Sequence, residues 1–115
     1  FFIALGGYSD TCHLSSPMIC GWAVQVSFSD GFVTNEGNSG GQLSYTTNQW
    51  NDVELIVDFD SDTQTFKFNG QELYTASWTA EQSNGSPLAL NALDLFSNGG
   101  TSVYWDDIKI VEITD

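Results

Sequence analysis

The sequence has 115 residues, 41% of them hydrophobic and 14% aromatic, which is enough to form the core of one folded domain. Two basic and 15 acidic residues give a formal net charge of −13, which would repel nucleic-acid phosphates and anionic lipid headgroups. No apolar run approaches the ~20 residues that a membrane-spanning helix needs. We therefore expect a single domain over residues 1–115, with no nucleic-acid partner and no insertion into a membrane.

Residues 1–5 are all apolar, a pattern typical of a strand that is covered on both faces or lies at a contact between subunits. Gly6 and Gly7 end this run. Because the chain starts without Met in the middle of the expected strand, we expect it to be a segment of a longer protein.

Cys12 and Cys20 lie close together in the sequence, on either side of His13. A cysteine pair of this kind in a Gly- and Ser-rich chain favours a disulfide that closes a short loop, and hence an exported protein. Two free thiols or a metal site are the alternatives. The metal site is disfavoured because zinc needs three or four protein ligands and the chain has one histidine.

The next segments alternate between strands and turns. Residues 22–28 place apolar side chains on every second position, and Asp30-Gly31 marks the turn that leads to a short return at residues 32–34. The sequence NEGNSGG, residues 35–41, predicts a flexible polar loop before a further strand at residues 42–46.

Residues 50–77 carry two hairpin signals in succession, and the rest of the chain is expected to pack against them. Val53, Leu55, Val57 and Phe59 fall on alternate positions, which is the pattern of a strand with one buried face, and only Ile56 interrupts the acidic residues between them. Residues 60–63, DSDT, predict a reversal stabilised by short side chains. After a second strand, Asn69-Gly70 is the strongest short-range signal for a tight two-residue turn, and residues 71–77 form the third strand.

The carboxyl-terminal third contains a connection at residues 78–86, with one helical turn at most, and an apolar strand at residues 88–96. Residues 97–101, SNGGT, predict a turn before a last strand at residues 102–113. Turns at intervals of roughly 8–12 residues without a long helix indicate an all-β fold, and we predict an antiparallel β-sandwich.

Asp106 and Asp107 are neighbours in the predicted last strand, so their side chains should point to opposite faces of the sheet. One carboxylate would then face the core, where a bound Ca²⁺ or hydrogen bonds from backbone amides would have to satisfy it. Asp58, Asp60 and Asp62 have the spacing of a calcium loop but lack its Gly and its closing Glu, so we interpret them as part of a hairpin turn.

Catalysis has little support in the sequence. The single histidine, His13, lies within the cysteine loop, where a surface position is a more common role than general base. Glycoside hydrolysis needs two carboxylates held across a cleft, and the glutamates are scattered along the chain. We therefore expect no enzymatic activity, and a fragment of a polysaccharide-degrading enzyme remains an alternative.

The chain has four Trp and four Tyr, and most of these rings must lie in the core. A ring exposed beside Asn, Gln and Asp would instead form an apolar platform with a polar rim, which suits a sugar. Trp78 and Tyr74, at the edge of the meander and beside a loop, are the predicted platform residues, and Tyr45 is a weaker third.

The segment WNDVELIVDFDSDTQTFKFNGQEL and the later LALNALDLFSNGGTSVYWDDIKIVE resemble the concanavalin A-like lectin and laminin G-like domains of secreted, multidomain bacterial proteins. The ending Tyr104-Trp105-Asp106-Asp107-Ile108 also resembles the last strand of jelly-roll carbohydrate-binding modules, in which the Asp pair helps to hold a structural calcium ion. The resemblance implies a jelly-roll sandwich and favours Asp107 as the calcium ligand. Family members are commonly longer at the amino end, so it also implies that early strands are missing here.

These observations together predict a non-catalytic, secreted or cell-surface module that binds a glycan or polysaccharide or mediates adhesion. A structural subunit of an extracellular fibre is the alternative from a different class. In that case an open apolar strand edge at the amino end would pair with neighbouring copies or domains.

Overall fold

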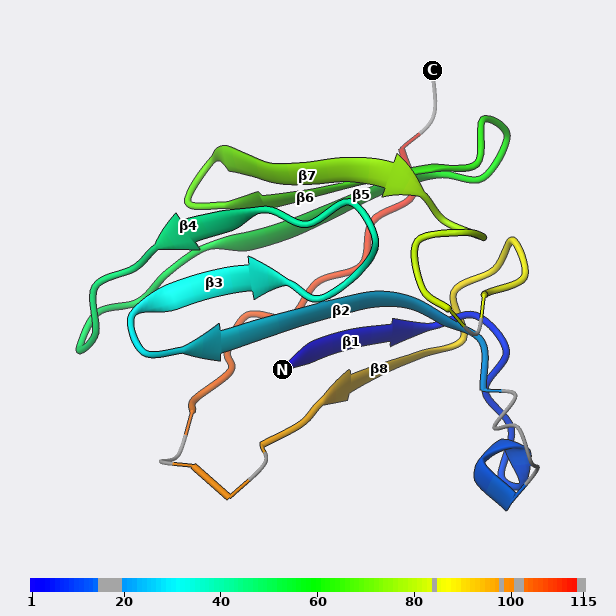
Figure 1. Cartoon of the computed structure of the whole chain (residues 1–115), viewed down its shortest axis with the longest axis horizontal. Coiled ribbons are helices and arrows are strands. Elements are labelled where there is room, and N and C mark those ends of the chain that lie inside the picture. The colour runs from blue at the N-terminus through cyan, green and yellow to red at the C-terminus, as the bar shows by residue number, and fades with distance from the viewer. Residues whose placement is uncertain (15–19, 84, 98, 101–102, 114–115) are drawn as a thin grey trace.

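The computed structural model describes residues 1–14, 20–83, 85–97, 99–100 and 103–113, and these residues form two antiparallel β-sheets. Its elements are β1 (Phe2–Leu5), the 3-10 turn η1 (Cys12–Leu14), β2 (Trp22–Ser29), β3 (Phe32–Asn35), β4 (Gln42–Ser44), β5 (Val53–Asp58), β6 (Thr63–Phe68), β7 (Gln71–Ser77) and β8 (Ala92–Leu95). The larger sheet has the order β4-β3-β2-β1-β8, and the smaller sheet is the meander β5-β6-β7. The predicted all-β sandwich is confirmed (Figure 1).

The core lies between the two sheets and is made by the alternating apolar positions of their strands. In β6 every second side chain is buried, so Phe66 and Phe68 face the larger sheet while Thr65 and Lys67 lie outside. Phe66 meets Phe2 of β1 edge to face, with ring centroids 5.5 Å apart. The hairpin that the sequence predicts here therefore turns one face of its strands towards the core.

Two tight turns have the backbone geometry that their sequences predict. Asp30 and Gly31 have φ of 55° and 83°, and Asn69 and Gly70 have φ of 51° and 78°. Positive φ at both central residues is the mark of the hairpin turn whose twist matches that of the flanking strands. Asx and glycine residues tolerate this region, which explains why the sequence places them there.

The amino-terminal strand does not leave an open edge. β1 pairs with β2 on one side and with β8 on the other. The prediction that this strand would offer its edge to neighbouring copies is therefore wrong, because both rows of its backbone groups already have strand partners.

The loop at residues 35–41, predicted to be flexible, is held by hydrogen bonds to the connection after β7. The amides of Asn38 and Ser39 donate to the main-chain oxygen and to the carboxylate of Glu81, and the Asn35 side chain donates to the carbonyl oxygen of Gly40 over 3.0 Å. Glu81 is buried, so its carboxylate depends on such donors.

The disulfide between Cys12 and Cys20 is confirmed, with Cα atoms 4.9 Å apart. Both cysteines are buried and pack against Ile3 and Leu5 of β1. The predicted loop between them includes residues 15–19, which lie outside the described residues.

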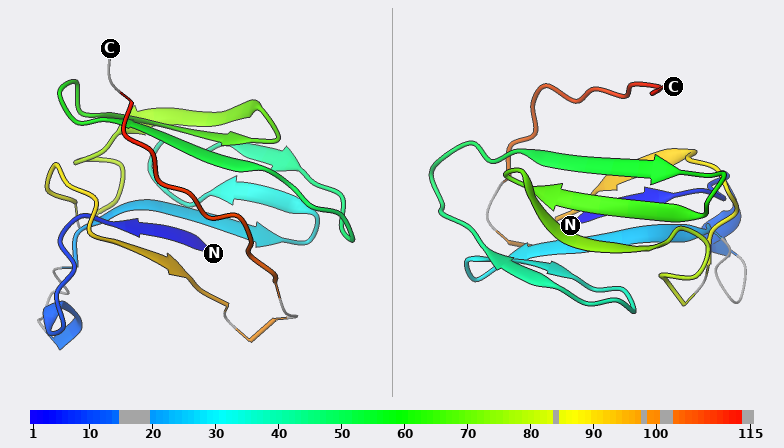
Figure 2. Two further views of the ribbon diagram at one scale, coloured as in Figure 1. Left: turned by 180° about the vertical axis from the view of Figure 1, so that it is seen from behind. Right: turned by 90° about the horizontal axis from the view of Figure 1, so that it is seen from above.

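The predicted last strand is wrong for residues 103–113. This segment runs in an extended path across the open side of the sandwich, from beyond the end of β8 towards β5, without belonging to a sheet (Figure 2). The predicted strand at residues 88–96 is also shorter than expected and is limited to β8. Both edges of β1 are occupied, so the segment finds no strand partner there.

Candidate functional site

Trp78 and Tyr74, the predicted platform residues, lie in the core. Trp78 is fully buried, its indole nitrogen donates to the carbonyl oxygen of Pro87 over 2.9 Å, and its ring meets Phe59 edge to face. Tyr74 is buried because β7 carries a bulge opposite Phe66, which turns both Leu73 and Tyr74 inward. The prediction that these rings form an accessible platform is wrong.

Tyr45, the third predicted platform residue, is partly buried. Its ring packs edge to face on Phe28 and Phe68, with centroids 6.4 and 6.3 Å away. Tyr45 is therefore packed against the core and is not a freely exposed platform.

The structure instead exposes Trp50, in the loop between β4 and β5, with 71% of its surface accessible. Next to it, Asn51 accepts hydrogen bonds from the side-chain amides of Gln49 over 3.3 Å and Asn69 over 3.0 Å. Asn69 also accepts from the backbone amide of Asp52 over 2.7 Å. This loop thus combines an exposed indole with side-chain amides held in place by one another.

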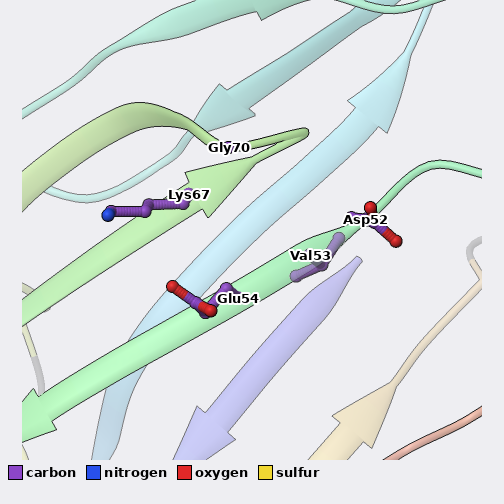
Figure 3. Close-up of a pocket in the computed structure, with 5 residues that line it drawn as sticks. All are labelled: Asp52, Val53, Glu54, Lys67 and Gly70. Carbon is purple, nitrogen blue, oxygen red and sulfur yellow. The ribbon is translucent and has the colours of Figure 1, made fainter.

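A hollow of about 370 Å³ lies at the same end of the smaller sheet and is lined by Asp52, Val53, Glu54, Lys67 and Gly70. Glu54 and Lys67 are directly opposite in the register of β5 and β6, and Figure 3 shows their side chains on neighbouring strands with Asp52 at the start of β5. Two carboxylates and an ammonium group therefore line a shallow depression that begins two residues after Trp50.

The sequence around Trp50 already favours an exposed ring more than the sequence around Trp78 does. Trp50 stands in the run Asn48-Gln49-Trp50-Asn51-Asp52, outside the alternation of the following strand and flanked by amides. A tryptophan inside such a polar run has no apolar neighbours in the sequence to share a buried face, so the run favours an exposed position.

Asp106 and Asp107 do not have the environment that the calcium prediction assumed. Both are exposed, Asp107 has a φ of 53°, and its amide donates to the carboxylate of Asp106 over 2.8 Å. Neither carboxylate faces the core, whereas the preceding Trp105 packs on Phe2 and Phe28. Among the described residues no group of three or more His, Cys, Asp and Glu could hold a metal ion, and two exposed carboxylates do not fit the six to eight oxygens that Ca²⁺ takes.

The turn between β5 and β6 uses its aspartates as hydrogen-bond acceptors, as the hairpin interpretation predicted. The Asp58 carboxylate accepts from the amides of Asp60 and Ser61, and the hydrogen bonds from Ser61 lower the pKa of Asp58. Asp62 accepts from the amide and hydroxyl of Thr79, and these bonds lower the pKa of Asp62. Asp62 thereby ties the turn to the connection after β7.

His13, the only histidine, is exposed in η1 beside the disulfide. Within the part of the chain that the structure describes, no helix is long and apolar enough to cross a membrane. Comparison of this chain with protein-family models, curated proteins and solved structures finds no match.

Proposed function

We propose that this domain is a non-catalytic carbohydrate-binding module of a secreted or cell-surface protein, and that Trp50 is its sugar-stacking residue. The observation that supports the proposal is the exposed Trp50 indole beside the amide network of Gln49, Asn51 and Asn69. The jelly-roll, concanavalin A-like form of the sandwich belongs to this proposal and agrees with its two antiparallel sheets.

The chemistry of the loop suits a sugar ring. An indole offers a large, rigid, apolar face at low entropic cost, and the surrounding amides supply both donors and acceptors for hydroxyl groups. The Asp52 and Glu54 carboxylates in the adjoining hollow accept hydrogen bonds from hydroxyls, and Lys67 donates them.

The charge of the domain selects among polysaccharides. A net charge of −13 and the two carboxylates of the hollow oppose the approach of uronic acids and sulfated sugars. We therefore propose neutral polysaccharides as the ligand class. The disulfide agrees with an oxidising, extracellular location.

Affinity electrophoresis in gels that contain neutral or acidic polysaccharides tests the proposal. The wild-type domain should be retarded by a neutral polysaccharide, and Trp50→Ala should weaken binding about thirtyfold, since a central aromatic residue commonly contributes about 2 kcal/mol. Tyr104→Ala is a matched control, because Tyr104 is another ring with 80% of its surface exposed. It should leave the retardation unchanged.

Two outcomes would contradict the proposal: retardation by none of the polysaccharides, or equal retardation of the wild type and Trp50→Ala. An assay for reducing ends or unsaturated sugars on the same polysaccharides tests the enzyme alternative. We expect no product release above that of the Trp50→Ala variant.

A further inference from the structure

β5 forms a free edge of the smaller sheet. The carbonyl oxygen of Asp52 accepts a hydrogen bond from the amide of Asn69, which places its backbone groups on the side of β6. Backbone directions alternate along a strand, so the amides and carbonyls of Val53, Leu55 and Val57 point away from β6. β6 is the only strand paired with β5 among the described residues. These backbone groups are therefore available to another strand.

The core is incompletely covered along the same edge. Val53, Leu55 and Val57 of β5 are only partly buried, although they pack against the core. Leu93 and Leu95 of β8, the facing edge strand of the larger sheet, are likewise partly buried. In β6, by contrast, Phe66 and Phe68 are buried. The partly buried apolar side chains of β5 and β8 therefore lie along the edge at which the smaller sheet ends.

Residues 103–113 run along the side of the sandwich where β5 and β8 leave the core partly covered (Figure 2). The ring of Trp105 holds the segment to the core by packing on Phe2 and Phe28. Further along, Glu112 and Ile113 share with residues 56–60 a hollow of about 460 Å³. The segment runs in the same direction as β5 (Figure 2). No backbone-to-backbone hydrogen bond joins residues 103–113 to the other described residues.

We propose that the free edge of β5, together with the hollow that residues 56–60 share with Glu112 and Ile113, is an acceptor site for one extended peptide strand of a binding partner. A strand antiparallel to β5 would also be antiparallel to residues 103–113, because both flanks run in the same direction. Its backbone would pair with Val53, Leu55 and Val57 on one side and with the unpaired segment on the other.

The neighbouring side chains determine the chemistry of this partner strand. Its inward residues must be apolar to cover the partly exposed Leu55 and Leu93. Its outward residues would lie beside Glu54 and Asp58, which alternate with Ile56 on the outer face of β5. Opposite charges across neighbouring strands are stabilising. The site therefore selects an extended segment in which apolar and basic residues alternate.

A second copy of this domain is disfavoured as the occupant. Its own unpaired segment carries Asp106, Asp107 and Glu112 against a single Lys109, so it would place carboxylates beside Glu54 and Asp58. Like charges directly opposite are destabilising, and each copy carries a net charge of −13.

A capped synthetic peptide of about ten residues, in which Lys and Val alternate, is a direct probe of the site; this length matches a full strand. In amide hydrogen exchange, the peptide should slow exchange at Val53, Leu55 and Val57 by at least about tenfold, as expected for newly bonded strand amides. The same peptide with Glu in place of Lys should bind about tenfold more weakly. N-methylation of the Lys amides or of the Val amides blocks opposite edges of the strand, and each should abolish binding.

The variant Glu54→Gln/Asp58→Asn removes the two charges and should reduce the preference for Lys over Glu peptides to less than about twofold. Glu72→Gln on β7 is a matched control that should keep the preference, because Glu72 lies in the opposite edge strand. Unchanged exchange at the β5 amides, protection of the β4, β7 or β8 edges instead, or an effect of N-methylation on one edge alone would overturn the proposal. Dimers that protect the β5 amides without peptide would overturn it in favour of a second copy.

Discussion

Tyr74 donates a hydrogen bond to the side-chain oxygen of Gln64 over 2.6 Å inside the core. The amide nitrogen of Gln64 donates in turn to the carbonyl oxygens of Ala23 over 2.8 Å and Ser77 over 3.1 Å. Ala23 belongs to the larger sheet and Gln64 to the smaller one, so this buried polar chain joins the two sheets. Because the Tyr74 hydroxyl and both ends of the Gln64 side-chain amide have partners, these two side chains are held in one orientation.

Tyr74→Phe should lower the free energy of unfolding by about 1–3 kcal/mol, because it leaves the Gln64 oxygen unpaired in the core. Chemical denaturation measures the change. Tyr45→Phe is the control, since no described residue bonds the Tyr45 hydroxyl, and it should change stability much less. Equal effects of the two substitutions would show that the Tyr74 hydrogen bond contributes nothing specific.

The same residue should limit stability at high pH. Burial, with a smaller contribution from the Glu81 carboxylate, raises the pKa of Tyr74, so folding favours the neutral phenol. The stabilisation is fully present below the pKa of an unfolded tyrosine, about 10, and is lost as the pH rises from there towards the folded value. Wild-type protein should therefore lose more stability above about pH 10 than Tyr74→Phe, as denaturation curves at several pH values would show. Identical alkaline limbs would contradict this expectation.

Asp62→Asn should weaken the link between the β5–β6 turn and the connection after β7. Hydrogen bonds from Thr79 lower the pKa of Asp62, so its contribution is present above the unfolded pKa of about 3.9 and is lost as the pH falls through the folded value. The variant should melt at a lower temperature at neutral pH and should show a shallower decline in acid. Asn tolerates the φ of 54° at this position, which keeps the backbone unchanged.

The control for Asp62 is Asp60→Asn in the same turn, because Asp60 is exposed and no described group donates to its carboxylate. Its melting temperature should match that of the wild type between neutral and acidic pH. A loss as large as that of Asp62→Asn would mean that general charge on the turn, and not the bonds from Thr79, sets the stability.

Reduction of the Cys12–Cys20 disulfide should lower stability by at most about 2–3 kcal/mol, because the bridge closes a short loop. Cys12→Ser/Cys20→Ser should lose more than the reduced wild type, since both sulfurs are buried against β1 and a hydroxyl is poorly accommodated there. Thermal melts with and without reductant measure both changes. A melting temperature that does not respond to reductant would contradict the prediction.

Calcium should leave the melting temperature unchanged. Asp106 and Asp107 are exposed, so a chelator would leave no buried, uncompensated charge at either carboxylate. Melts in excess chelator and in millimolar calcium should superimpose. A calcium concentration of 100 times the dissociation constant would otherwise stabilise the fold by about 2.7 kcal/mol, and an increase of that size would restore the calcium site that the sequence resemblance implies.

The sequence by itself determined the features whose causes are local. Asp30-Gly31 and Asn69-Gly70 adopt positive φ because these residue types tolerate it, and the period-two pattern of β5 and β6 follows from the alternation of side chains along a strand. The disulfide was also predictable, since Cys12 and Cys20 are near in the sequence. None of these features depends on a distant segment.

Only the tertiary structure decided which side chains are accessible and which strands find partners. Residues 103–113 have a strand-like sequence, but a strand needs a paired neighbour: β1 is already paired on both sides, and no backbone hydrogen bond joins the segment to the free edge of β5. Trp78 and Trp50 both border loops in the sequence, yet Trp78 is buried against Phe59 and bonded to Pro87, whereas Trp50 is exposed. The polar run around Trp50 favours exposure, but the burial of Trp78 depends on contacts between residues far apart in the chain, so its local sequence could not reveal it.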